Sequence, residues 1–105
     1  MTNAAYSKAQ SEDLEIPEDI LHFLKAMDAF ARSAPGKPSV LKLGVLNSMR
    51  HAVTDSLAAA SVKCPLGNPP TDITTRVDST GNIHMECFHS NPQHCWDLSG
   101  HKQPC

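Results

Sequence analysis

The stretch that decides the fold is DITTRVDSTGNIHMECF, residues 72–88. Apolar or small side chains alternate with polar ones on both sides of a turn at residues 78–82, a period of two that is typical of half-buried β-strands. If the turn closes symmetrically, Val77 lies opposite Ile83 and one face of the hairpin collects the apolar side chains. Those side chains are Ile73, Thr75, Val77, Ile83, Met85 and Cys87. The stretch therefore predicts an antiparallel hairpin with one buried face.

A second turn, at residues 90–93, leads into a third apolar segment at residues 94–99. Placing His89 opposite His94 puts Trp96 on the buried face of the hairpin and Cys95 on the opposite face. The predicted strands, 72–77, 83–89 and 94–99, then form a three-stranded antiparallel β-meander.

Before residue 72 the apolar period is 3.6 rather than two. Pro17 suits the first position of a helix, where its missing N–H costs nothing, and Ser39 is a natural N-cap. The apolar positions repeat at the i, i+3, i+4 spacing of amphipathic helices. The sequence therefore predicts helices at 17–33 and 39–61, joined as an αα-hairpin by the Pro- and Gly-containing residues 34–38.

The chain of 105 residues is expected to be one α+β domain, residues 16–100, in the order ααβββ. Two amphipathic helices would pack on one face of the three-stranded meander. Residues 1–15 are polar and are predicted to be a flexible N-terminal arm, and residues 101–105 a C-terminal tail. About 85 folding residues lie near the size at which one core becomes marginal, so we expect a partner subunit, a metal or a disulfide to supplement it.

Composition excludes some partners and sets an expectation for the cysteines. A net charge of −2 gives no long-range attraction to nucleic acid or to an anionic membrane. No apolar run approaches the ~20 residues that span a bilayer, and the first residues lack the apolar region of a secretory signal. We therefore expect a cytoplasmic protein, in which free or metal-bound thiols are favoured over disulfides.

Cysteine and histidine concentrate near the C-terminus, which favours a metal hypothesis. Cys87, His89 and His94 can share a face near the tip of the second hairpin, and Cys64 or Cys105 would complete a zinc site with four ligands. Cys95 is an alternative fourth ligand. The chain has no Cys-x₂₋₄-Cys pair, which structural zinc sites usually contain. The expected cofactor is therefore none, with zinc as the alternative.

The same residues have other interpretations. Cys87 also fits a small buried side chain beside Trp96, and the histidines fit solvent-exposed loops. A thiol-dependent enzyme using Cys87 or Cys95 is a third class of function, but no nucleophile motif accompanies either cysteine. We predict no enzyme activity and no catalytic residues.

The leading functional hypothesis rests on surplus apolar residues. The helices carry more apolar surface than one small sheet can bury, especially at residues 40–46. Such surplus usually packs against a partner or a second copy. We expect a small regulatory protein of the anti-activator or inhibitor type that masks a surface of another protein, such as a transcriptional regulator, or forms a homodimer. The candidate contact residues are Leu21, Phe23, Leu41, Leu43 and Val45. Alternatively, Leu41 and Leu43 pack against the first helix within the monomer.

Overall fold

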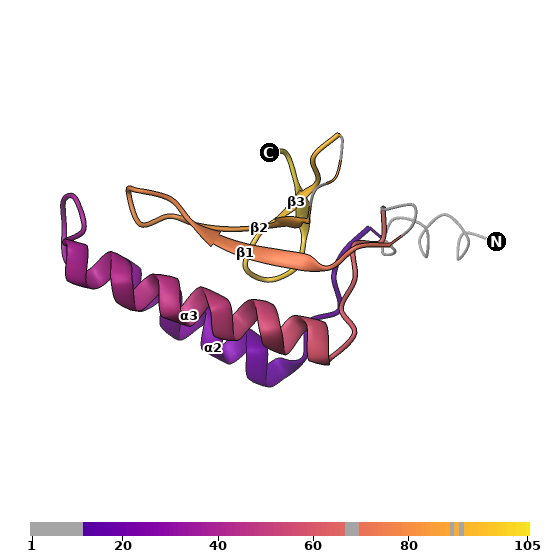
Figure 1. Ribbon diagram of the computed structural model, residues 1–105, viewed down its shortest axis with the longest axis horizontal. Coiled ribbons are helices and arrows are strands. Elements are labelled where there is room, and N and C mark those ends of the chain that lie inside the picture. Colours follow the sequence, from indigo (N-terminus) through magenta and orange to yellow (C-terminus); the bar gives the residue numbers. More distant parts are fainter. Residues whose placement is uncertain (1–11, 67–69, 89, 91) are drawn as a thin grey trace.

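The computed structural model describes residues 12–66, 70–88, 90 and 92–105 (Figure 1). Two helices, α2 (Glu18–Ala31) and α3 (Val40–Ala59), precede strands β1 (Ile73–Val77), β2 (Ile83–Cys87), β3 (Cys95–Trp96) and β4 (Lys102–Gln103). The strands form one antiparallel sheet in the order β1-β2-β3-β4, and Figure 1 shows both helices on the same side of it. The α+β class is therefore confirmed. Within the described ranges, neither helix has the length and apolarity needed to cross a membrane.

Each helix begins one residue later than predicted, at Glu18 and Val40, with Pro17 and Ser39 as the N-cap residues. Pro17 precedes α2, and two acidic residues occupy its first turn, at the positive end of the helix dipole. The Ser39 hydroxyl accepts a hydrogen bond of 3.1 Å from the Lys42 N–H and so caps α3. Each helix ends two residues earlier than predicted, at Ala31 and Ala59. The buried faces consist of Ile20, Leu24 and Met27 in α2 and Leu46, Val53 and Leu57 in α3.

The hairpin of β1 and β2 has the predicted register, with Val77 opposite Ile83. One carboxylate oxygen of Asp78 accepts hydrogen bonds from the backbone N–H groups of Thr80 and Asn82, at 2.9 and 3.0 Å. A side chain that satisfies backbone donors in this way stabilises a tight turn. The hairpin is therefore fixed both by its alternating pattern and by its turn.

The register between β2 and β3 is not the predicted one. Met85 pairs with Trp96 and Glu86 with Cys95, a shift of two residues from the pairing of His89 with His94. Because side chains alternate with a period of two, this shift leaves every residue on its predicted face. Trp96 is accordingly buried against the core. The third strand contains two residues instead of the predicted six, because the chain turns again at Asp97.

The predicted C-terminal tail instead contains a fourth strand. Lys102 pairs with Trp96, and Gln103 with Cys95. The turn between β3 and β4 is held by the Asp97 carboxylate, which accepts the backbone N–H groups of Ser99 and His101 at 2.9 Å each. The sheet therefore has four strands rather than three.

The predicted flexible arm is wrong from residue 12 onward. The Leu14 N–H donates to the Gly100 carbonyl at 2.8 Å, and the Asp13 carboxylate accepts the Lys102 N–H at 3.0 Å. The Trp96 indole N–H donates to the carbonyl of Glu12 at 2.6 Å. This N-terminal strap, residues 12–15, thus lies beside β4 and contributes Leu14 to the core. The rest of the predicted arm, residues 1–11, lies outside the described residues.

The other edge of the sheet is also contacted by the rest of the chain. The Thr54 hydroxyl of α3 accepts the Thr75 N–H of β1 at 3.1 Å, and Arg50 donates to the Thr75 carbonyl at 3.4 Å. At the start of β1, Lys63 forms a β-bridge and an ion pair with Asp72. Contacts of this kind protect an edge strand from pairing with another chain. The sheet edges are therefore poor sites for adding a partner's strand.

Candidate functional site

The four cysteines form two disulfides, Cys64–Cys87 and Cys95–Cys105. The expectation of free or metal-bound thiols is therefore wrong for this structure. The Cys64 N–H donates to the Thr71 carbonyl, which brings the segment after α3 beside the sheet and places Cys64 next to Cys87. The expectation rested on cellular compartment, whereas the pairing follows from long-range contacts that the residue spacing does not reveal.

The predicted metal ligands do not form a metal site in this oxidised chain. A metal binds the thiolate form of cysteine, and the Cys87 sulfur is instead bonded to Cys64. His94 is half-buried before β3, and its carbonyl accepts the Cys87 N–H at 3.1 Å. His89 lies outside the described residues. The part of the chain that the structure describes contains no group of three His, Cys, Asp or Glu side chains placed to hold a metal ion. Zinc binding stays a prediction for the reduced chain.

Three of the five predicted contact residues lie on the exposed surface of the helices. Leu41 is 78% exposed, and Phe23 and Val45 are also exposed. Leu41, Val45 and Ala52 are spaced by four and seven residues, which places them on one face of α3. Phe23 of α2 lines a groove with Ala52 at the far end of that face. We call this set, Phe23, Leu41, Val45 and Ala52, the helical patch.

The other two predicted contact residues are partly covered. Leu21 and Leu43 are both half-buried. Leu43 stands two positions from Leu41 and from Val45 on α3, a spacing that turns it to the other side of the helix. Within the monomer Leu41 is therefore left exposed while Leu43 is not. The proposed packing of Leu41 against the first helix is not what the structure has.

The groove of the helical patch has a volume of about 140 Å³. It is lined by Asp19, Ile20 and Phe23 of α2 and by Ala52, Val53 and Ser56 of α3. Small side chains at Ala52 and Ser56 leave room between the helices. Cavities of ~150 Å³ with apolar walls accept a molecule the size of benzene. Sequence reasoning missed this groove, because small residues such as Ala52 give no apolar signal.

The outer face of the sheet, on the side away from the helices, is polar and charged. Arg76 donates to the Glu86 carboxylate at 2.8 Å, and His84 lies 2.8 Å from the Asp78 carboxylate. The hydrogen bond with His84 is the largest of several that hold the pKa of Asp78 well below its usual range. Burial raises the pKa of Glu86, but hydrogen bonds from Arg76 and Gln93 outweigh it and lower that pKa. Both carboxylates are therefore ionised at neutral pH.

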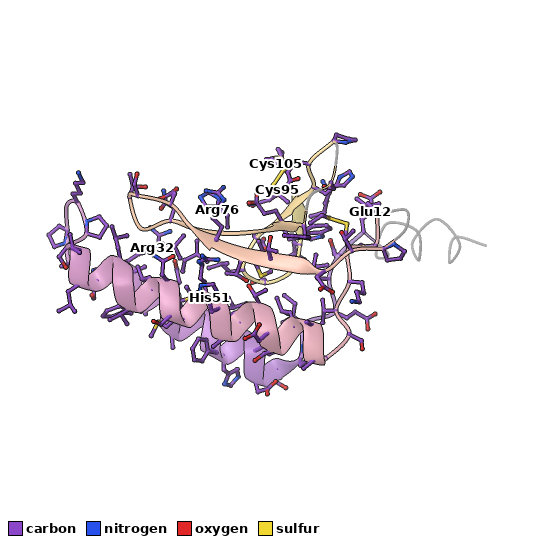
Figure 2. All side chains as sticks on the ribbon, in the orientation of Figure 1. Glu12, Arg32, His51, Arg76, Cys95 and Cys105 are labelled. Carbon is purple, nitrogen blue, oxygen red and sulfur yellow. A yellow bond between two sulfur atoms is a disulfide. The ribbon has the colours of Figure 1, made fainter. Side chains whose placement is uncertain are left out.

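The two disulfides lie in different surroundings. Cys64 and Cys87 are 0% and 1% exposed and belong to the core. Cys105 is exposed, and its bond to Cys95 lies on the outer face of the sheet, on the same side as Arg76 (Figure 2). A polar cavity of about 220 Å³ adjoins this bond. Its lining includes Arg76, His84, Glu86, Gln103 and both cysteines.

Comparison with protein-family models, with curated proteins and with solved structures found no match to this chain. Function is therefore inferred from the helical patch and from the outer face of the sheet.

Proposed function

We propose that this is a non-enzymatic binding protein that recognises another protein through the helical patch. The observation that carries the proposal is the exposed apolar face of α3, where Leu41 and Val45 lead to the groove beside Phe23. Exposed apolar side chains that gather on one face of a soluble protein are typical of interaction surfaces. No cofactor, nucleic acid or membrane lipid takes part in the proposed activity.

The groove favours a partner that inserts one aromatic or branched aliphatic side chain. Its volume suits a single such group, and its walls at Ile20, Phe23 and Val53 are apolar. Burying that group would contribute about 1.5–3 kcal/mol to binding. The contacts along β1 and β4 disfavour the alternative in which a partner adds a strand to the sheet. We therefore propose docking of a partner's helix or loop on the helices.

For the biological role we propose an inhibitor or anti-activator that masks a functional or dimerisation surface of its partner. A transcriptional regulator, the class of partner expected from the sequence, requires a reducing compartment, so this partner class depends on the thiol-trapping test described below. A second copy of this chain is the other occupant to test, because an exposed apolar face on a small domain is also typical of a homodimer.

The cellular location needs revision. The sequence predicts the cytoplasm, where thiols stay reduced, whereas two disulfides support an oxidising compartment. Trapping the thiols with an alkylating reagent at the moment of cell lysis tests this. Recovery of the native protein with all four cysteines alkylated would show that they are reduced in the cell and would support a cytoplasmic location.

Two charged substitutions test the binding proposal. Leu41→Asp and Val45→Asp place a charge in the helical patch, and Asn47→Asp places the same charge elsewhere on the exposed surface of α3. Each immobilised variant is incubated with native extract, and the retained proteins are quantified by mass spectrometry. We expect a partner that wild type and Asn47→Asp retain but both patch variants lose, while circular dichroism stays unchanged.

Sedimentation of the purified chain distinguishes the two occupants. A homodimer dissociated by Leu41→Asp assigns the patch to a second copy. A monomer whose retained proteins are the same for every variant would contradict the proposal. Leu43→Asp is a poor test, because this half-buried residue can lose binding by disturbing the fold.

A further inference from the structure

We propose that the Cys95–Cys105 disulfide is a site of exchange with small thiols that carry carboxylates, and that the exchange leaves a mixed disulfide on Cys105. The Cys64–Cys87 disulfide is structural and does not take part. This second site lies on the outer face of the sheet and is independent of the helical patch.

Accessibility separates the two bonds. Thiol–disulfide exchange requires an incoming thiolate to reach one sulfur of the bond. Cys64 and Cys87 are enclosed by the core, so a thiol reaches them only after the domain opens. Cys105 is exposed, whereas Cys95 is buried. Attack in the folded state is therefore directed to the sulfur of Cys105.

The polar cavity beside the bond supplies recognition. Arg76 lines this cavity together with Cys105, and its side chain is 51% exposed although its Nε donates to Glu86. A guanidinium carries five N–H donors in a planar fork that matches a carboxylate. A thiol with a carboxylate can thus place its sulfur at Cys105 and its charge near Arg76. An uncharged thiol has no such contact.

The reaction balances without any further reagent. The incoming thiolate forms a bond to the Cys105 Sγ and breaks the bond to Cys95, whose Sγ receives the electron pair and takes a proton from water. The Cys95 Sγ lies 3.9 Å from Oε2 of Glu86, so the sulfur that leaves is released beside this carboxylate. In the reverse reaction the Cys95 thiolate attacks the Cys105 sulfur and expels the small thiol.

The fold is expected to survive this opening. β4 remains attached through its pairing with β3 and through the hydrogen bond from the Lys102 N–H to Asp13. Opening the bond would release Pro104 and Cys105 from the sheet. Exchange at this bond therefore modifies the outer face of the sheet without unfolding the domain.

The test treats the intact oxidised protein with glutathione at neutral pH, quenches with an alkylating reagent, and maps the products by peptide mass spectrometry. We expect glutathione on Cys105, the alkyl group on Cys95 and an intact Cys64–Cys87 bond. Arg76→Gln should slow the reaction with glutathione about 1.4- to fivefold, the range for one exposed ion pair. Its reaction with the uncharged thiol 2-mercaptoethanol should not change.

Two further variants serve as controls. Arg76→Lys keeps the charge but lacks the planar fork and should restore part of the rate, and Arg32→Gln removes an exposed charge from the end of α2 and should have no effect. Equal slowing of both thiols by Arg76→Gln would overturn the recognition by Arg76. Opening of Cys64–Cys87 at the same rate, glutathione found on Cys95, or no reaction at either bond would overturn the exchange site itself.

Discussion

Removing each disulfide separately should reveal that Cys64–Cys87 supports the core, whereas Cys95–Cys105 closes a local loop around β3 and β4. The double variant Cys64→Ala/Cys87→Ala removes the buried bond, and Cys95→Ala/Cys105→Ala removes the exposed one. The two bonds join residues separated by 23 and 10 positions in the sequence. A chain-entropy model assigns them about 3.4 and about 2.7 kcal/mol of stabilisation at 25 °C. On loop length alone the two variants would differ little.

Burial widens this difference. Cys64 and Cys87 belong to the core, so replacing both with alanine also removes packed sulfur atoms and leaves a cavity that costs about 1–2 kcal/mol. The first double variant should therefore lose about 5 kcal/mol of unfolding free energy. The second should lose about 2.7 kcal/mol or less, because Cys105 is exposed and its loss leaves no cavity in the core. For a domain of this size the first loss lowers the melting temperature by at least about 20 °C.

The assay measures unfolding in urea without reductant, with circular dichroism as the signal. A first variant that is already unfolded in water agrees with the expectation, since small domains have total stabilities of about 5–15 kcal/mol. The result that would refute the reasoning is a loss from the exposed pair equal to or larger than the loss from the buried pair. Stability would then depend on the outer face of the sheet rather than on the core.

Three other substitutions test the turns and the N-terminal strap. Trp96→Phe removes the hydrogen bond to the Glu12 carbonyl and should cost about 1–3 kcal/mol with faster hydrogen exchange at Leu14; unchanged exchange there would contradict the contact. The pKa of Asp78 is lower in the folded chain than the pKa of about 3.9 in the unfolded chain, so ionised Asp78 stabilises the fold above that pH. The free energy of unfolding should therefore fall as the pH drops below about 3.9, and Asp78→Ala should make this fall smaller in unfolding measured across an acid titration. Gly100 has φ +91°, and a Cβ there would lie 2.7 Å from the Leu14 carbonyl oxygen. Gly100→Ala should therefore lower the free energy of unfolding in urea by about 1–3 kcal/mol. An unchanged free energy would exclude the close approach of Gly100 to Leu14.

The parts of the fold that were predictable are those with a long local pattern. The alternation through residues 72–88 and the apolar stripes of both helices identify the two helices and the first hairpin with its register. β4 was missed because two residues, Lys102 and Gln103, are too few to show a period. The strap at residues 12–15 was missed because polar residues normally predict exposure. Here the backbone of the strap and the Asp13 carboxylate make the hydrogen bonds, and Leu14 is its one apolar side chain in the core.

The candidate sites were predictable to a smaller extent. Helical spacing separates Leu41 and Val45 from Leu43 once the position of the sheet is known, but sequence alone does not say which side the sheet covers. The Cys64–Cys87 disulfide forms because the segment after α3 lies beside the end of β2, and these two segments are far apart in the sequence. The sequence gives the number of cysteines but does not show which of them lie close together in the fold.

The disulfides and the helical patch have a common physical explanation. A domain of this length would ordinarily need most of its large apolar side chains in the core. Each disulfide supplies about 3 kcal/mol, which equals or exceeds the 1.5–3 kcal/mol gained by burying one leucine or phenylalanine. The chain can therefore stay folded while Leu41 and Phe23 remain on its surface. We infer that the two cross-links lower the number of apolar residues that the core requires, so that this small domain can keep the apolar residues of the helical patch exposed.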